Sequence, residues 1–426
     1  MISDKRRRAR SAAGGGGPVR SSPLDRNPGG RKGRGPAANS QSTATTIISG
    51  RLDGIDGLRA AAALWVVGFH IHAFSHVRFP AWTGIDLFLR SGSTGVSLFL
   101  VLSGFCLYLP YAGGRSERFQ AGAFFKRRFQ RLMPAYCVAL AGSAILAIVI
   151  PTFSGSPIDW RDIGLSFAAH LAQLQALFPS TFYSLNGAYW SLGLEWQLYL
   201  LLPLLILAVR RFGLGWTVVS VVLVNIAYRS ALWAIDGRLL AHDSPWLQYV
   251  LPNQFAGRWA EFALGMVAAE LYVAGRVPAV ARKLWPALAL LVPLSILLVG
   301  TQLSHIVFGS VFAILLLLVL SPGNPIQRVF SWRPLVAVGI MSYSLFLVHQ
   351  PLVQFSAALL LAHGASHGQA FFELVLAIPL IFALAWALFI GVERRALTAY
   401  RFTSPGLLER VLFFRSSPSV PAPADH

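Results

Sequence analysis

The sequence predicts an all-α protein that crosses a lipid bilayer several times. Of its 426 residues, 55% are hydrophobic and only 12% are charged, whereas a soluble domain carries about 25% charged residues. The apolar residues gather in continuous runs, most of which reach the ~17–25 residues that a spanning helix needs, and they lack the alternation of barrel strands. We therefore expect lipid to be the solvent around most of the outer surface.

Residues 1–51 differ from the rest of the chain. They hold many Lys and Arg residues against only Asp4 and Asp25, and Gly, Ser, Pro and Ala fill most of the other positions. The segment has no apolar periodicity and lacks the apolar core of a signal peptide. We expect a disordered, basic cytoplasmic tail here, a transmembrane domain over residues 52–400, and a second disordered tail over 401–426.

The positive-inside rule orients the apolar runs, because Lys and Arg gather in cytoplasmic loops. One run, Ile163–Phe178, breaks the alternation of inner and outer ends and contains His170. It is interpreted as a non-spanning or re-entrant segment on the outer side. We expect about ten spanning helices and both termini in the cytoplasm. The spanning runs are Leu58–Val77, Gly95–Tyr111, Leu132–Pro151, Leu194–Val209, Leu214–Ile235, Phe255–Tyr272, Leu284–Gly300, Ile306–Leu320, Leu335–Leu361 and Phe371–Val392.

The formal net charge of +19 does not indicate nucleic-acid binding. The Lys and Arg residues lie in the tails and between apolar runs, which is the topology signal of a membrane protein. The two cysteines, Cys106 and Cys137, both fall inside apolar runs, and the chain has no CxxC or HExxH spacing. We therefore expect neither a disulfide nor a metal site.

Ionisable side chains inside a span are costly and are candidates for function. Arg59 and His70 are eleven residues apart, which places them within ~20° of one helix face and ~16 Å apart along its axis. Asp56 can hold the Arg59 guanidinium. Taken separately, Arg59 also fits a residue that orients the span, and His70 a histidine satisfied by a neighbouring helix. In a later run, Arg258 and Glu261 are expected to form an ion pair.

Polar residues in three distant runs fall at similar depths. His70 lies ~18 Å and His349 ~21 Å from the inner ends of their spans, and Ser103 lies about halfway along its own span. Glu195 opens another span on the outer side. We therefore expect polar groups from distant parts of the chain to lie at one level in the membrane.

Five segments carry a resemblance to a known family. They are Asp56-Gly-Leu-Arg59 with His70, Gly95–Phe105, the basic stretch Arg127–Pro134, Trp190-Ser-Leu-Gly-Leu-Glu195, and Ser342–His349. In this order they resemble the motifs of the membrane acyltransferase-3 family over residues 52–395. The departures are small: Trp196, Leu198 and Phe346 stand where the family often has other residues.

The resemblance implies a bacterial, multi-pass O-acyltransferase of the cell membrane. Such an enzyme would move an acyl group, usually acetyl, from acyl-CoA to a hydroxyl of a carbohydrate or glycosylated acceptor. Acyl-CoA would be a co-substrate, so no permanently bound cofactor is expected. Arg127, Arg128 and Arg131 would bind the CoA phosphates through bidentate contacts. On sequence alone, these arginines fit the positive-inside rule equally well.

The same comparison suggests roles for the polar residues in the spans. His70 would be the general base that takes the proton of the attacking hydroxyl. Arg59 would guide the donor, Glu195 would orient the acceptor or a catalytic imidazole, and His349 is a further catalytic candidate. An acyl-enzyme intermediate stays open. The supporting candidates are Asp56, which would hold Arg59, and Ser103 and Tyr343, either of which could stabilise an oxyanion.

Two alternatives belong to other functional classes. A proton-coupled secondary transporter would also use His and Arg residues in its spans, but transporters often contain two related halves, and the chain has no internal repeat. A membrane glycan transferase with a lipid-linked donor would not need the Arg-x-x-Arg pair at Arg128 and Arg131 on a cytoplasmic loop. Acyl transfer is therefore the favoured prediction.

Overall fold

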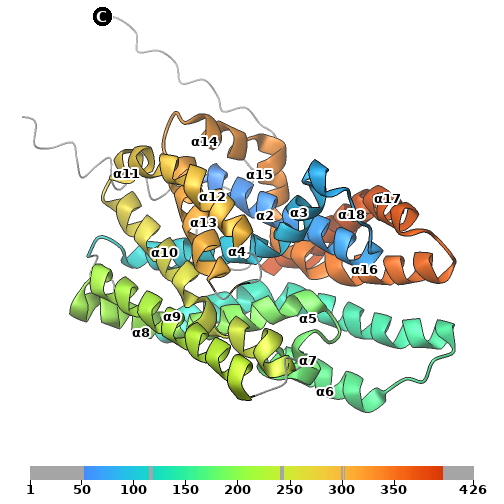
Figure 1. The fold of residues 1–426 in the computed structure, drawn as a ribbon. Helices are drawn as coiled ribbons and strands as arrows, with labels where there is room; N and C mark the ends of the chain where they lie inside the picture. Colours follow the sequence, from blue (N-terminus) through green and yellow to red (C-terminus); the bar gives the residue numbers. More distant parts are fainter. Residues whose placement is uncertain (1–51, 115–118, 240–243, 299–300, 302, 397–426) are drawn as a thin grey trace, which may run out of the picture. The chain divides into compact units, whose positions relative to one another are not determined.

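The computed structural model describes residues 52–114, 119–239, 244–298, 301 and 303–396. These residues belong to one unit, residues 51–426, and the tails predicted at 1–51 and 401–426 lie outside the described residues. The described part is helical and contains no strand, as expected (Figure 1). The elements that matter here are α2 (Asp53–Ser75), α3 (Ile85–Arg90), α4 (Gly95–Tyr108), α5 (Ala121–Ser154), α6 (Trp160–Leu171), η4 (Gln175–Leu177), α7 (Pro179–Phe182), η5 (Gly187–Tyr189), α8 (Trp190–Phe212), α9 (Leu214–Leu239), α10 (Phe255–Val273), α11 (Val277–Leu284), α12 (Leu288–Leu297), α13 (Ser304–Leu320), α14 (Pro325–Phe330), α15 (Arg333–Ile340), α16 (Ser342–Ala362), α17 (His367–Leu376), α18 (Ile378–Leu388) and η9 (Phe389–Glu393).

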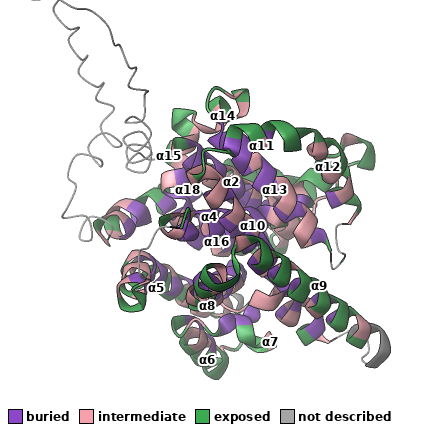
Figure 2. Ribbon diagram, turned by 90° about the vertical axis from the view of Figure 1, so that its left-hand side faces the viewer, coloured by how far each residue is buried: buried purple, intermediate pink, exposed green. Residues whose placement is uncertain are grey.

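The buried core lies where α2, α4, α10, α13 and α16 pack against one another (Figure 2). α4 and α10 meet at backbone contact. A Cβ on Gly104 would overlap the backbone of Phe262, and one on Gly265 would overlap the carbonyl of Val101. Small residues at such crossings allow helices in a membrane to approach closely. The contact fixes α4, which carries Ser103, against its neighbours.

The outer helices expose large apolar side chains. Leu200, Leu204 and Leu207 of α8 are each more than 60% exposed, as are Trp216 of α9 and Leu297 of α12. Exposed apolar surface on this scale is unfavourable in water and favourable against lipid. The pattern supports a multi-pass membrane protein.

Seven of the described helices are long and apolar enough to cross a membrane, or eight if the bent pair α17–α18 is one span. Helices also occupy the other expected runs. However, α10 carries Arg258, Glu261 and Glu270, and α13 has only 17 residues. Both helices are largely enclosed by other helices, so lipid does not dictate their length or composition. The number of ten spans and the orientation of the termini stay predictions.

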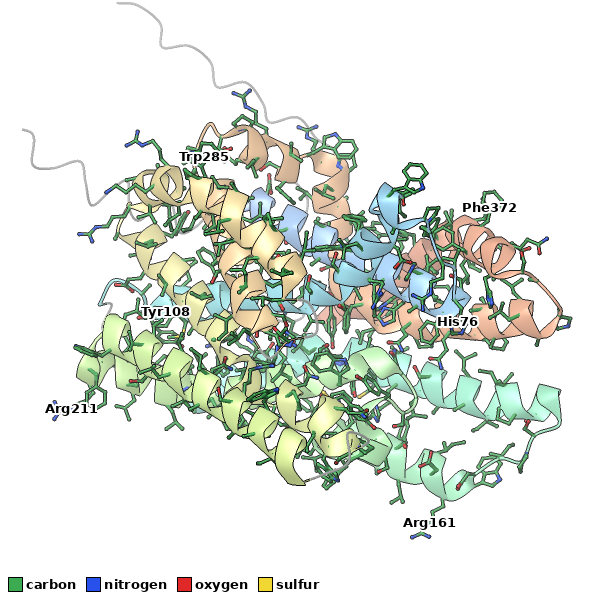
Figure 3. The ribbon with its side chains drawn as sticks, in the orientation of Figure 1. His76, Tyr108, Arg161, Arg211, Trp285 and Phe372 are labelled. Atoms are coloured by element: carbon green, nitrogen blue, oxygen red, sulfur yellow. The ribbon has the colours of Figure 1, made fainter. Side chains whose placement is uncertain are left out.

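The two ends of the helical bundle carry different parts of the sequence. Tyr108, Arg211 and Trp285 lie toward one end of the bundle, at the left of Figure 3. His76 and Arg161 lie toward the other end. The two groups of residues therefore mark opposite ends of the bundle.

The segment Ile163–Phe178 contains no spanning helix, as predicted. α6 has only 12 residues and is followed by the short turns η4 and α7. Asp159 caps α6, because its carboxylate accepts a hydrogen bond from the Asp162 amide at 2.9 Å. His170 is fully buried, and this burial lowers its pKa to about 4, so the ring is neutral.

The run Leu335–Leu361, expected to be one span, forms two helices. α15 ends at Ile340 and α16 begins at Ser342. In α15, a Cβ on Gly339 would overlap the Asp56 carbonyl, so this glycine lets α15 pack directly on the start of α2. α16 alone has the length of a span.

Candidate active site

His70 of α2 and His349 of α16 are in direct contact. Nε2 of His349 lies 3.2 Å from Nδ1 of His70, and the ring centroids are 4.9 Å apart. His349 is fully buried, whereas His70 is partly accessible. The two residues are 279 positions apart in the sequence, and their contact agrees with the similar depths calculated for them.

The backbone around the two rings fixes their tautomers. Nδ1 of His349 lies 2.8 Å from the Phe346 carbonyl, and Nδ1 of His70 lies 2.9 Å from the Val66 carbonyl. A carbonyl only accepts hydrogen bonds, so both Nδ1 atoms carry a proton when the rings are neutral. The single Nδ1–H of His70 is then shared between the Val66 carbonyl and Nε2 of His349, and the lone pair of His70 Nε2 is left for an incoming hydroxyl.

A cavity of about 310 Å³ lies between α2, α4, α5, α8 and α16. Its lining combines three cations and two acids with hydroxyl and apolar groups. Among the residues predicted for the site, those that line it are Arg59, Ser103, Arg128, Arg131, Glu195 and Tyr343. Six side chains from five helices thus meet around one space.

The basic part of the cavity comes from α2 and α5. Arg59 lies 3.6 Å from the Asp56 carboxylate, as predicted, and its guanidinium is 3.8 Å from the sulfur of Cys106. Arg128 lies over the ring of Phe124, and its Nε atom is buried without a hydrogen-bond partner. A buried N–H donor with no acceptor is costly, so this part of the cavity has unused capacity to bind an anion.

In the acidic part of the cavity, Glu195 of α8 is hydrogen-bonded to side chains of α4 and α8. Glu195 accepts hydrogen bonds from the Ser103 hydroxyl, at 3.2 Å, and from the Tyr199 hydroxyl. The hydroxyl of Tyr343 donates to the Leu132 carbonyl at 3.0 Å. Ser103 and Tyr343 therefore use their only hydroxyl protons within the protein, and either would have to exchange that bond to stabilise an oxyanion.

The two histidines lie beyond the end of the cavity. Phe99 and Phe346 line this end, and their ring centroids are 6.1 Å apart. The ring of His349 follows at 5.5 Å from Phe346. Phe346 therefore contacts both the cavity and the histidine pair.

Arg127 does not line this cavity. It borders a different hollow, together with Lys126, Met133 and Cys137. Arg127 is thus separated from Arg128 and Arg131, with which it was grouped in the sequence.

An acid and a tyrosine that line the cavity were not singled out from the sequence. Glu393, in the π-helical turn η9, is buried and accepts a hydrogen bond of 2.5 Å from the Ser344 hydroxyl. It stands just before Arg394 and Arg395, and two adjacent arginines after an apolar run fit an ordinary cytoplasmic loop by the positive-inside rule. Tyr199 occurred within a matched motif, but nothing in the sequence identified its hydroxyl as the partner of Glu195.

Arg258 and Glu261 form the predicted ion pair away from the cavity. Nε of Arg258 donates to Glu261 at 3.0 Å, and a terminal nitrogen donates to the other carboxylate oxygen at 2.9 Å. Ser97 and Asn253 accept further hydrogen bonds from Arg258 at 3.1 and 3.0 Å. This fully bonded arrangement indicates a structural role.

The helices expose apolar side chains on their outer faces and enclose a polar cavity and a pair of histidines. These features are typical of a multi-pass membrane enzyme. The model of the acyltransferase-3 family, an acyltransferase domain, matches residues 52–390. Since this match covers most of the chain, the protein belongs to the acyltransferase-3 family and is an acyltransferase, as the sequence motifs predicted.

Several characterised relatives are similar to this chain. Peptidoglycan O-acetyltransferase OatA of Listeria monocytogenes is 24% identical over 331 residues, which cover 72% of this chain and 50% of the relative. O-acetyltransferase OatA of Staphylococcus aureus is 27% identical over 329 residues, with 71% and 51% covered. Acyltransferase MdmB of Streptomyces mycarofaciens is 28% identical over 331 residues, with 73% and 81% covered. The chain spans about half the length of the two OatA proteins, and no solved structure matches it.

Proposed function

We propose that the protein transfers an acyl group, with acetyl as the first choice, from acyl-CoA to a hydroxyl of a carbohydrate or glycosylated acceptor. One observation carries the proposal: a cavity lined by an arginine cluster is also lined by Phe346, whose ring contacts one of a pair of hydrogen-bonded histidines. The names of the relatives support acetyl transfer to oxygen, and one of them names peptidoglycan as the substrate.

The basic part of the cavity fits the donor. Arg128 and Arg131 line it together with Arg59, and the buried Nε of Arg128 needs an acceptor. Guanidinium groups bind phosphate through paired hydrogen bonds. The cavity is at the small end of the range for ligand sites, so it fits the narrow pantetheine arm of CoA better than the whole molecule.

The histidine pair supplies the acid–base chemistry. The hydroxyl oxygen of the acceptor attacks the thioester carbonyl carbon, and its proton passes to Nε2 of His70. The new ester C–O bond forms, the C–S bond breaks, and His70 returns the proton to the leaving CoA sulfur. While His70 is cationic, the lone pair of His349 Nε2 stabilises its Nδ1–H. Proton transfer of this kind typically contributes ~10²–10⁴ in rate.

The proposal is tested by supplying the protein, reconstituted in liposomes, with acetyl-CoA radiolabelled in the acetyl group. Peptidoglycan fragments and a sugar-bearing macrolide serve as separate acceptors. We expect label to appear in at least one acceptor as an ester that mild alkali releases, and to be absent with heat-inactivated protein. If no acceptor gains label and the protein does not bind acetyl-CoA, the proposed donor is wrong.

A further inference from the structure

Pro351 leaves a backbone carbonyl without its helical partner close to the histidine pair. It lies inside α16, two residues after His349. Proline has no N–H, so the carbonyl four residues earlier, that of Leu347, lacks the regular helical hydrogen bond. Leu347 is fully buried, and a buried carbonyl without a donor is unfavourable. The donor has to come from another part of the chain.

Two side chains that precede α8 supply this donor. Nδ2 of Asn186 and the hydroxyl of Tyr189 each lie 3.0 Å from the Leu347 carbonyl oxygen. Both residues are buried, at 1% and 0% exposure. Oδ1 of Asn186 accepts from the Ala188 amide at 3.0 Å, so the side chain also fixes its own segment. One carbonyl is thus held by two donors from a single short segment.

This segment has an unusual backbone conformation and packs closely against α16. Leu185 has a φ of 56°, a left-handed conformation that leucine rarely adopts. At Gly187, a Cβ would overlap the side-chain amide of Gln350. Such conformations persist only where the surroundings enforce them, and here the neighbouring residues contact Leu347 and Gln350 of α16.

The contact joins two walls of the active site. α16 carries Phe346 and His349, and α8 begins directly after Tyr189 and carries Glu195. We infer that Asn186 and Tyr189 are positioning residues, which hold the Leu347 carbonyl and thereby keep His349 in contact with His70. The inferred effect on catalysis rests on the function proposed above.

The test compares two buried tyrosines. Tyr189→Phe removes the donor to Leu347, whereas Tyr136→Phe removes an equivalent donor whose acceptor, the His170 carbonyl at 3.1 Å, lies outside α16. Small displacements of catalytic groups can cost up to ~10²-fold in rate. We expect Tyr189→Phe to lower kcat about tenfold without changing KM for acetyl-CoA, and Tyr136→Phe to leave both parameters unchanged.

Two further variants separate positioning from packing. Asn186→Ser keeps an oxygen that can bond to the Ala188 amide but is too short to reach Leu347, so it is expected to act in the same direction as Tyr189→Phe. Pro351→Ala returns the missing N–H to α16, so in that background the loss caused by Tyr189→Phe should shrink. Equal losses of kcat in Tyr189→Phe and Tyr136→Phe, or an undiminished loss beside Pro351→Ala, would overturn the inference.

Hydrogen exchange of residues 345–352, measured in the same samples, gives a readout that does not depend on activity. Faster exchange in Tyr189→Phe than in Tyr136→Phe supports the positioning role, and equal exchange contradicts it. If the wild-type protein transfers no label, the proposed function fails, while the exchange measurement still decides whether Tyr189 holds α16.

Discussion

Nε2 of His349 lies 3.2 Å from Nδ1 of His70, and the remaining nitrogen of His349 faces the Phe346 carbonyl. Together with the Val66 carbonyl, 2.9 Å from the same nitrogen, His349 orients His70, and its Nε2 lone pair stabilises the cationic form of His70. This role resembles that of the aspartate in a serine protease triad, except that the orienting group here is neutral.

The first prediction concerns this orienting role. His349→Phe keeps an aromatic ring in the buried site but removes the acceptor for His70. We expect kcat to fall by roughly 10–10²-fold, because His70 loses one of the two acceptors that orient it and the partner of its cation. Steady-state kinetics with labelled acetyl-CoA measure the change. An unchanged kcat would mean that the contact has no catalytic role.

The second prediction separates the arginines that the sequence grouped together. Arg131→Gln should raise KM for acetyl-CoA by about 10-fold or more, since a hydrogen bond to a charged group contributes ~1.5–3 kcal/mol. Arg127→Gln is the matched control, because Arg127 borders a different hollow. Equal increases in KM for both variants would show that the donor does not bind in the cavity.

The third prediction uses the two cysteines as reporters. Cys106 lines the cavity beside Arg59, whereas Cys137 borders the separate hollow near Arg127. A membrane-permeant maleimide should label Cys106 more slowly when acetyl-CoA is present. Labelling of Cys137, measured in a Cys106→Ser variant, should not change. Protection of Cys137 alone would place the donor in the other hollow.

The fourth prediction concerns stability. Arg258→Met leaves the buried carboxylate of Glu261 without its cation, and breaking such a pair typically costs about 3–5 kcal/mol. Thermal unfolding in detergent should show a large loss for this variant and a smaller loss for the double variant Arg258→Met/Glu261→Met. The pair is separate from the cavity, so kcat per folded molecule should be retained. A single variant as stable as the wild type would contradict the buried ion pair.

Much of the site could be predicted because spans obey simple geometry. A rise of 1.5 Å per residue was enough to place His70 and His349 at similar depths, and the contact between them confirms that estimate. The Asp56–Arg59 pair followed from their three-residue spacing on one helix. The interruption of charge alternation at Ile163–Phe178 likewise identified the segment without a spanning helix.

The remaining features depend on packing that a single sequence does not encode locally. The rotation of α5 about its axis decides that Arg128 and Arg131, and not Arg127, face the cavity. Glu393 reaches the site because η9 places it beside Ser344 of α16, although its position next to two arginines fits an ordinary inner loop. Neither the rotation of α5 nor the contact of Glu393 with Ser344 produces a periodic pattern that could be recognised in the sequence.

The most direct test of the account compares His70→Ala with the wild type in one membrane preparation, measuring both acetyl-CoA binding and the transfer of label to the acceptor. The arginine cavity is unchanged in this variant, so binding should be retained, while transfer should fall by ~10²–10⁴. Transfer at the wild-type rate would contradict the assignment of His70 as the base.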